Sequence, residues 1–258
     1  MYTREQTISR MNALGRAECP FFFVISHDMG HNLLFEPSET ERERMAAFSL
    51  PLGAMGSQDG GPPLPERLRF IPSPQPMSRY AASFASVRNH LMRGDSYLLN
   101  LCVSTPVETN LTLRHLFRFA RAPYRMLLGP DARISGVHGR GCVCFSPEPF
   151  VTVRGRSIST FPMKGTAPSA TQEARRWLET DEKENRESAT IVDLMRNDLS
   201  MVATGVRVKR YRYISPVETS KGSILQCSSE ISGLLPENWR SRLGEILLKL
   251  LPAGSVTG

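Results

Sequence analysis

The sequence predicts an α+β fold, and three patterns indicate it. Two short runs rich in β-branched and aromatic residues, 150–154 and 157–161, flank a turn signal at Gly155 and predict a hairpin. Apolar residues recur at helical spacing over 78–92 and again over 182–199. Because strands and helices are both expected along the chain, we predict a mixed architecture in which helices pack on sheets.

A region rich in Pro and Gly, residues 51–76, predicts an irregular connector. The segment before it includes FFFVI at 21–25, an apolar run of strand length. We therefore divide the chain into an N-terminal portion with its connector, residues 1–77, and a main body, residues 78–258.

The main body is expected to begin with a helix. Its apolar residues run from Tyr80 to Leu91, the helix should end near Gly94, and a strand is predicted over 97–103. In 206–213, Val and Tyr alternate with Arg and Lys, which is typical of a half-exposed strand with a basic solvent face. Shorter helices are expected over 112–121 and 241–251.

Length and composition exclude several classes of protein. The chain has 258 residues, 40% of them hydrophobic, which is enough to bury a substantial core. Charged residues make up 22%, no run of about 18 apolar residues occurs, and the polar N-terminus lacks a signal-peptide pattern. Five cysteines without zinc-site spacing fit a reducing compartment. We therefore expect a soluble cytoplasmic protein without a membrane span, in which Cys142 and Cys144 are small core residues of a strand.

The net charge of +7 raises nucleic-acid binding as an alternative. Apart from 206–213 and the pair at 175–176, however, the basic residues are scattered singly among acids. Binding to nucleic acid depends on Lys and Arg that together neutralise several phosphates. We therefore expect no nucleic-acid partner, and a salt-dependent gel shift with generic duplex would favour the alternative.

The predicted hairpin carries an acid and an amine to one place. Folding about residue 156 sets Glu148 opposite Lys164. Prolines on both sides of Glu148, and one shortly before Lys164, cannot donate to a ladder, so strand pairing should end there and leave room for a pocket. An acid and an amine would then flank one small molecule. The alternative is a surface hairpin with a solvated ion pair, worth at most about 1 kcal/mol.

The helix expected over 182–199 carries the second chemical pattern. At about 100° per residue, Glu184 and Glu187 share one face with an apolar stripe that includes Ile191 and Met195, so both carboxylates should point toward protein. Carboxylates three residues apart repel each other, and a hard dication such as Mg²⁺ relieves the repulsion through oxygen ligands. The alternative is an acidic first turn that complements the helix dipole.

Two turns that contain glycine have groups suited to an anion. Their backbone N–H groups and hydroxyls can face a carboxylate. Taken alone, both segments also fit plain turns. The residues concerned are Gly165, Thr166, Gly254, Ser255, Thr257 and Gly258.

Four segments, in order, resemble the motifs of the chorismate-utilising enzymes. They are GDSYLLNL at 94–101, SPEPF followed by PMKGT within 146–166, EKENRESATIVDLMRNDLSMV at 182–202, and LLPAGSVTG at 250–258. The resemblance covers the chain from about Ser78 onward. The Lys of PMKGT is typical of aminodeoxychorismate synthase component I, whereas anthranilate synthase typically carries Ala there. The sequence is therefore most similar to the aminodeoxychorismate synthase branch.

The resemblance implies a chorismate-binding fold like that of anthranilate synthase component I, with antiparallel sheets packed against helices. It also implies amination of chorismate to 4-amino-4-deoxychorismate, on the folate and para-aminobenzoate route, with ammonia from a glutaminase subunit. Lys164 would attack C2 of chorismate and form an adduct that ammonia displaces, while Glu148 would protonate the leaving hydroxyl. Mg²⁺ held by Glu187, with Glu184 at a neighbouring acidic position, would bind the ring carboxylate, and the two Gly turns would anchor substrate carboxylates.

Two departures from the family pattern keep alternatives open. Gln226 stands where many relatives carry His, so a proton-handling group would be lost there. The family motif that matches LLPAGSVTG normally continues into a segment with further Mg²⁺-binding glutamates, so we expect 78–258 to be an incomplete catalytic domain of a longer reading frame. Within the family, the alternative is an isochorismate or salicylate synthase, which adds water. From another class, the alternative is an inactive chorismate-fold scaffold that only binds the glutaminase.

Overall fold

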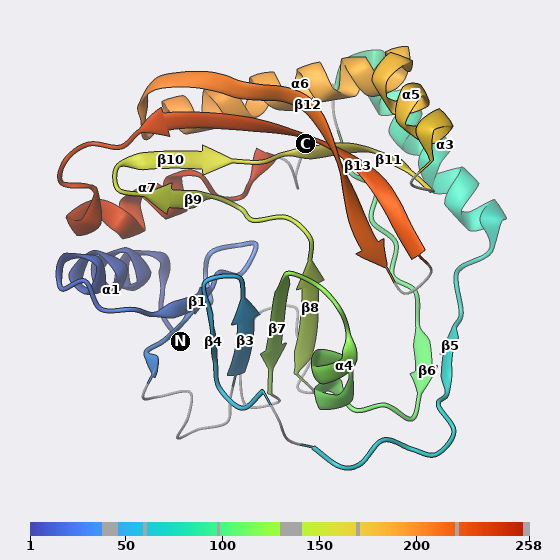
Figure 1. Cartoon of the computed structure of the whole chain (residues 1–258), viewed down its shortest axis with the longest axis horizontal. Helices are drawn as coiled ribbons and strands as arrows, with labels where there is room; N and C mark the ends of the chain where they lie inside the picture. Colours follow the sequence, from blue (N-terminus) through green and yellow to red (C-terminus); the bar gives the residue numbers. More distant parts are fainter. Residues whose placement is uncertain are drawn as a thin grey trace.

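Strands form four antiparallel sheets in the part of the chain that the structure describes, and helices pack around them (Figure 1). This computed structural model describes residues 1–37, 46–58, 61–96, 99–129, 141–168, 171–219 and 222–254. The expected α+β fold of antiparallel sheets and helices is therefore confirmed. None of the described helices is long and apolar enough to cross a membrane.

The largest sheet has five strands and carries much of the candidate site. Its order is β11-β13-β10-β9, and β12 also pairs with β13. The predicted hairpin is confirmed, because β9 and β10 pair with Val153 opposite Ile158, and Gly155 turns between them at φ +60°. The strand predicted over 206–213 lies within β12. The five strands are β9 (Thr152–Arg154), β10 (Ser157–Thr160), β11 (Met163–Ala167), β12 (Thr204–Thr219) and β13 (Gly222–Leu234).

Helix α6 (Glu182–Ser200) lies along this sheet and confirms the predicted helix (Figure 1). Its buried apolar residues, among them Ile191, pack against Ile158 of β10. Asp181 caps the N-terminus of the helix, because its side chain accepts a hydrogen bond from the Glu184 N–H (3.0 Å). The first turn of the helix, which holds the candidate acids, is therefore fixed at its start. The helix that precedes α6 is α5 (Gln172–Thr180).

A second sheet, of order β4-β3-β7-β8, leads the chain to the candidate site. Its strand β8 ends at Ser146, two residues before Glu148. Cys142 in β8 is half-buried, but Cys144 is exposed, so the prediction that both are core residues is wrong for Cys144. In the described part of the chain β8 is an edge strand, with a neighbour on one side only. The elements here are β3 (Ala46–Leu50), β4 (Gly53–Met55), α4 (Leu113–Phe119), β7 (Tyr124–Leu128) and β8 (Cys142–Ser146).

Helix α1 (Arg4–Arg16) packs against α7 (Leu243–Lys249) beside the sheets (Figure 1). Two glycines allow the helices to approach closely. A Cβ on Gly15 would lie 2.2 Å from a backbone carbonyl oxygen, and one on Gly244 would lie 2.6 Å from the backbone of α1. Strands β1 (Phe22–Val24) and β2 (Leu33–Phe35) pair with each other, and the 3-10 helix η1 (Trp239–Arg242) leads into α7.

A core shared by α1 and α7 joins the N-terminal portion to the main body. Met11 and Leu14 of α1 are buried together with Leu247 and Leu248 of α7. Residues on both sides of the expected boundary at residue 77 therefore contribute to one core. The division of the chain at that residue stays a proposal.

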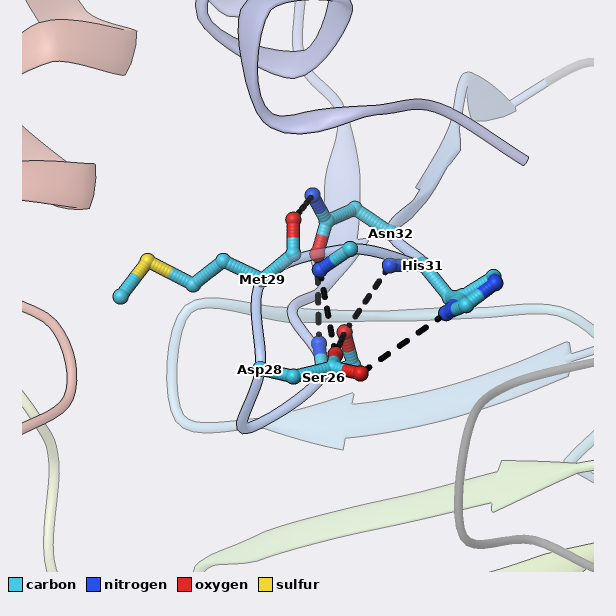
Figure 2. Close-up of polar contacts among 6 residues, drawn as sticks. Ser26, Asp28, Met29, His31 and Asn32 are labelled. Atoms are coloured by element: carbon cyan, nitrogen blue, oxygen red, sulfur yellow. Dashed lines mark hydrogen bonds and ion pairs between the residues drawn. The ribbon is translucent and has the colours of Figure 1, made fainter.

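The loop between β1 and β2 is closed by polar contacts around Asn32, as Figure 2 shows. The buried Asn32 side chain accepts a hydrogen bond from the Ser26 N–H (3.2 Å) and donates to the Met29 carbonyl oxygen (3.0 Å). The Ser26 hydroxyl donates to Asp28 (2.6 Å), and this hydrogen bond lowers the pKa of Asp28. Asn32 also donates to Thr7 of α1 (2.9 Å), which fixes the loop to that helix.

Helix α3 (Met77–Arg93) confirms the helix predicted over 78–92 and ends at Gly94, which has φ +79°. None of its residues is buried. Tyr80 and Phe84 stack on each other with ring centroids 6.2 Å apart, and they stay 38% and 51% exposed. The apolar stripe that predicted this helix is therefore correct in its spacing, although it faces no core in the described part of the chain.

The strand predicted over 97–103 is wrong for the residues that the structure describes there, 99–103, which lie outside any strand. An extended apolar segment becomes a strand only where a second strand offers partners for its backbone groups. The described residues of the connector predicted over 51–76, which are 51–58 and 61–76, are irregular apart from two short strands, β4 and β5. The strand β5 (Phe70–Pro72) pairs with β6 (Val107–Thr109).

Candidate active site

Glu148 lies in the turn that follows β8. Ser146 holds this turn, because its hydroxyl accepts a hydrogen bond from the Glu148 N–H (3.2 Å) and donates to the Glu148 carbonyl oxygen (3.0 Å). Burial raises the pKa of Glu148 to about 7, and the Lys164 ammonium acts in the opposite direction. The structure therefore brings the predicted acid and amine together, and a substantial fraction of Glu148 carries a proton at neutral pH.

A cavity of about 680 Å³ is lined by the sequence neighbours of this pair, whereas Glu148 and Lys164 themselves are not among its lining residues. Pro147 and Pro149, which flank Glu148, line it together with Met163, which precedes Lys164. The place where the prolines end the strand pairing is therefore also the place where the cavity begins. The polar and charged side chains of the cavity wall include Thr152, Arg154, Ser157, Ser159, Lys209, Tyr213, Ser215, Ser228 and Glu230.

Gly165 occupies an irregularity in β11 that fits glycine alone. The pairing of β11 with β13 shifts register between Met163 and Thr166, and Thr166 then stands opposite Gln226. Gly165 has φ +91°, and a Cβ there would lie 2.9 Å from Glu184 Oε2. The irregular part of β11 that carries Lys164 is therefore in close contact with a carboxylate of α6.

The two predicted acids of α6 differ in exposure. The Glu184 side chain is 12% exposed and reaches Gly165, whereas the Glu187 side chain is 46% exposed. The prediction that both point toward protein is correct for Glu184 and wrong for Glu187. Three residues advance a helix by about 300°, so Glu187 is rotated about the helix axis by about 60° from Glu184. This rotation leaves its side chain more exposed to solvent than that of Glu184.

Glu184 and Glu187 fit a hard dication such as Mg²⁺ that keeps several of its waters. Mg²⁺ is bound by carboxylate oxygens, and one or two carboxylates together with substrate groups are a common set of ligands. The Lys183 ammonium already lies between the two side chains, 4.0 Å from Glu184 Oε1 and 3.5 Å from Glu187 Oε1. Both carboxylates can therefore share one cation. In the described ranges of the chain, no group of three or more His, Cys, Asp or Glu side chains can hold a metal.

Asp198, at the other end of α6, fixes the last described residue of the chain. The Gly254 N–H donates a hydrogen bond to the Asp198 carboxylate; burial raises the pKa of Asp198, and this hydrogen bond lowers it. A Cβ at Gly254 would lie 2.8 Å from Leu194 Cδ2. Of the second predicted anion-binding turn, Gly254 is therefore placed against α6. The other predicted residues of that turn, Ser255, Thr257 and Gly258, lie outside the described residues.

Sequence reasoning missed Arg212. The alternation of 206–213 placed its side chain on a basic solvent face, but Arg212 is half-buried and donates to Ser188 Oγ (3.1 Å) and to the Leu178 carbonyl oxygen. No local pattern distinguishes this Arg from its neighbours, because an irregularity in the pairing of β12 with β13 reverses the alternation there.

Comparison with known proteins identifies the family. Residues 12–258 match the family described as chorismate binding enzyme. The chain belongs to this family. The resemblance drawn from the four motifs is thereby confirmed, and the protein is a chorismate-utilising enzyme.

Relatives within the chorismate binding family carry different names. The chain is 43% identical over 256 residues to an "Uncharacterized PabA-like protein" of Haemophilus influenzae, covering 99% of this chain and 74% of that protein. It is 32% identical over 192 residues to anthranilate synthase component 1 of Streptomyces coelicolor, covering 70% of this chain and 35% of that protein. It is 31% identical over 198 residues to aminodeoxychorismate synthase component 1 of Klebsiella aerogenes, covering 70% and 40%. Overall identity therefore does not distinguish the two reactions.

A solved structure shares the fold. The crystal structure of a protein from Bacillus anthracis, described as a 2,3-dihydroxybenzoate-specific isochorismate synthase, superimposes with a TM-score of 0.62 at 18% identity. The match covers 99% of this chain and 66% of that one. It confirms the chorismate-binding fold predicted from the motifs.

Proposed function

We propose that the protein aminates chorismate at C4 and forms 4-amino-4-deoxychorismate, as the component I of an aminodeoxychorismate synthase on the folate route in the cytoplasm. The observation that carries the proposal is the pairing of Lys164 with Glu148, a carboxyl group whose pKa lies near 7. Replacing the C4 hydroxyl requires an acid for the poor leaving group and a nucleophile that moves electrons through the ring diene. Lys164 and Glu148 supply these two groups side by side.

In the first half-reaction, the Lys164 ammonium first releases a proton to solvent, and the resulting neutral amine attacks C2 of chorismate. The C1=C2 electrons move to C1=C6, the C5=C6 electrons move to C4=C5, and the C4–O bond breaks. Protonated Glu148 gives its proton to the departing oxygen, which leaves as water. A general acid works best when its pKa is near the working pH, and the pKa of about 7 for Glu148 meets this requirement.

In the second half-reaction, ammonia takes the place of the lysine. Glu148 first recovers a proton from the Lys164 nitrogen in the adduct. Ammonia then adds to C4, the ring electrons return, and the C2–N bond breaks while Glu148 protonates the departing lysine nitrogen. The ammonium group on C4 finally returns a proton to Glu148. The sum is chorismate and ammonia converted to 4-amino-4-deoxychorismate and water, with both side chains regenerated.

The substrate is held by its carboxylates in this proposal. Glu184 and Glu187 would hold Mg²⁺, whose charge would neutralise the ring carboxylate. Because Gly165 contacts Glu184, a ring held in this way would lie beside the part of β11 that carries Lys164. Backbone N–H groups and the hydroxyl of the exposed Thr166 are suited to a second contact with the substrate.

Ammonia is expected from a glutaminase subunit, as in the relatives that the motifs resemble. Free ammonia is a small nucleophile that ammonium salts provide at alkaline pH. The chemistry of this chain can therefore be tested without the partner.

The test is to incubate the protein with chorismate, Mg²⁺ and an ammonium salt and to follow the products by liquid chromatography. We expect 4-amino-4-deoxychorismate from the wild type and from Lys249→Met, which removes an exposed lysine of α7. We expect none above background from Lys164→Met. Formation of isochorismate or salicylate in place of the amine would contradict the proposal, and so would full activity of Lys164→Met.

A further inference from the structure

Arg212 lies where β12 departs from regular pairing. Arg210 pairs with Glu230 and Tyr213 pairs with Ser228, so two residues of β12 stand opposite one residue of β13. Such a bulge turns side chains away from the face that the alternation would give them. Arg212 itself has φ +50°, a left-handed conformation that is rare outside glycine and that costs free energy unless its surroundings hold it.

The guanidinium of Arg212 joins two helices. Nη1 donates to Ser188 Oγ of α6 (3.1 Å), and Nη2 donates to the carbonyl oxygen of Leu178 in the last turn of α5. The carbonyl groups of the last turn of a helix have no partners within the helix, and a cation there also complements the helix dipole. One side chain therefore ties the end of α5 to the first half of α6.

The backbone of Arg212 is connected to the residue that precedes β11, the strand that carries Lys164. The Arg212 N–H donates to Ser229 Oγ (3.1 Å), and the Ser229 N–H donates to the Pro162 carbonyl oxygen (3.0 Å). Pro162 directly precedes β11. Through Ser229, Arg212 therefore connects the helices with the segment that leads to Lys164.

These contacts surround Glu184. Ser188 lies one helical turn after Glu184 on the buried face of α6, and Leu178 Cδ2 lies 3.3 Å from the Cβ position of Gly165, which in turn contacts Glu184. Burial raises the pKa of the Cys227 thiol; Arg212 lowers it and Glu184 raises it, so both charges act on one buried atom. The guanidinium is therefore close to the buried carboxylate on the inner side of the helix.

We propose that Arg212 is a positioning residue that fixes the rotation of α6, so that Glu184 and Glu187 present their carboxylates to a divalent cation beside the part of β11 that carries Lys164. The inference rests on the proposed function, since it concerns the same site. A hydrogen bond to Ser188 and another to the end of α5 stop α6 from turning about its axis. Groups of this kind, one shell behind metal ligands, typically change metal affinity about 10-fold to 100-fold when they are removed.

The test compares the binding of Mg²⁺, and of Mn²⁺ as a spectroscopic substitute, among variants by isothermal titration calorimetry. We expect Arg212→Met to weaken binding about 10-fold and Arg212→Lys, which keeps the charge without the fork, to be intermediate. Arg210→Met is the matched control. This substitution removes the same charge from the same strand, but the Arg210 side chain contacts Glu230 and Tyr213 and has no hydrogen bond to α5 or α6, both of which the structure describes in full. The cation affinity of Arg210→Met should therefore equal that of the wild type.

A second control separates positioning from general stability. Leu199→Ala opens the core at the far end of α6, where Leu199 is 1% exposed, and should lower stability without weakening cation binding. In Arg212→Met, amide hydrogen exchange in the first two turns of α6 should become faster than the change in global stability explains. In Leu199→Ala, the exchange of these amides should change only as much as global stability does. If Arg212→Met fails to fold, Ser188→Ala removes one acceptor alone and should still weaken binding about threefold, toward the low end of such effects.

Unchanged cation affinity in Arg212→Met, or in Ser188→Ala where the first variant does not fold, would overturn the inference. An equal loss in Leu199→Ala would overturn it as well. Glu184→Gln and Glu187→Gln distinguish this failure from that of the proposed function. If these two variants bind the cation as tightly as the wild type, Glu184 and Glu187 do not hold it, and both the cation site of the proposed function and the role of Arg212 fail. If they abolish cation binding while Arg212→Met does not weaken it, only the role of Arg212 fails.

Discussion

Burial raises the pKa of Glu148 to about 7, and the neighbouring Lys164 ammonium keeps it from rising further. The two groups come from different sheets: Glu148 follows β8 of the four-stranded sheet, and Lys164 belongs to β11 of the five-stranded sheet. Their contact therefore depends on how the sheets meet. It gives the protein an acid that holds a proton at neutral pH and an amine within reach of the same substrate.

Removing the amine should raise the pKa of Glu148. In Lys164→Met, burial continues to disfavour the carboxylate while the favourable charge is lost, so the pKa should move above 7. Carbon-13 NMR of protein labelled at Glu side-chain carboxyls measures the shift, with Lys249→Met as a control that should leave the titration in place. A Glu148 pKa that stays the same or falls in Lys164→Met would show that the two groups are not neighbours.

Glu148 should also make stability depend on pH. Its folded pKa lies above the ordinary carboxyl value of 4.5, so between pH 4.5 and about 7 the folded state binds more protons than the unfolded state, and stability falls as the pH rises through this window. Glu148→Gln removes the cost of the buried charge. At pH 8 the variant should be more stable than the wild type by on the order of 1 to 2 kcal/mol, less than the full shift gives because the side chain is partly exposed.

At pH 4 the same comparison should show no such gain, because the carboxyl group is then largely protonated in both states. Urea unfolding at the two pH values measures the difference. Glu237→Gln, which alters a carboxylate that is 88% exposed, should show no comparable change between them. A gain in Glu148→Gln that is equal at pH 4 and pH 8 would contradict the burial of this charge.

Gly165→Ala should weaken cation binding as well as stability. The new Cβ would lie 2.9 Å from Glu184 Oε2 at a φ of +91°, so Glu184 must move and the backbone is strained. Gly155→Ala is the matched control, since Gly155 has φ +60° with no atom within 4 Å of its Cβ position. Both variants should lose about 1 kcal/mol or more of stability, but Gly165→Ala alone should bind Mg²⁺ more weakly. Equal Mg²⁺ affinity in the two variants would argue against a cation site at Glu184.

Gly254→Ala should destabilise the protein through a clash with α6. Its Cβ would lie 2.8 Å from Leu194 Cδ2 and 3.0 Å from Asp198 Oδ2, and we expect a loss of about 1 to 3 kcal/mol in thermal or urea unfolding. Gly30→Ala, where the nearest atom is 3.6 Å away, should change stability far less. A Gly254→Ala protein as stable as Gly30→Ala would mean that the end of the described chain does not pack on α6.

Local patterns in the sequence were sufficient for several elements. The turn at Gly155 and the helical spacing from Glu182 onward depend on neighbours within a few residues, and both predictions are confirmed. An apolar run alone was not sufficient over 99–103, because a strand needs a partner that no local pattern specifies. Cys144 shows the same limit, since its exposure depends on the position of β8 at an edge of the described sheet.

The candidate site was predictable to the extent that its residues are close in the chain. The hairpin register predicted Glu148 near Lys164, although in the structure Glu148 follows a strand of one sheet and Lys164 belongs to another. The contact of Glu184 with Gly165 and the hydrogen bond from Gly254 to Asp198 join segments that the sequence separates by 19 and 56 positions. The contacts of Arg212 were beyond prediction, because a bulge in β12 reverses the face that alternation assigns to it.

The most direct test of the account is the mass of the Lys164 peptide after the protein has been incubated with chorismate and Mg²⁺ in the absence of ammonia. A single turnover is enough, so a slow reaction does not hide the result. We predict a gain equal to chorismate less one water on the peptide that contains Lys164, and its loss when an ammonium salt is added. No adduct on Lys164 while the same sample forms 4-amino-4-deoxychorismate once ammonium is present would contradict the central role of this lysine.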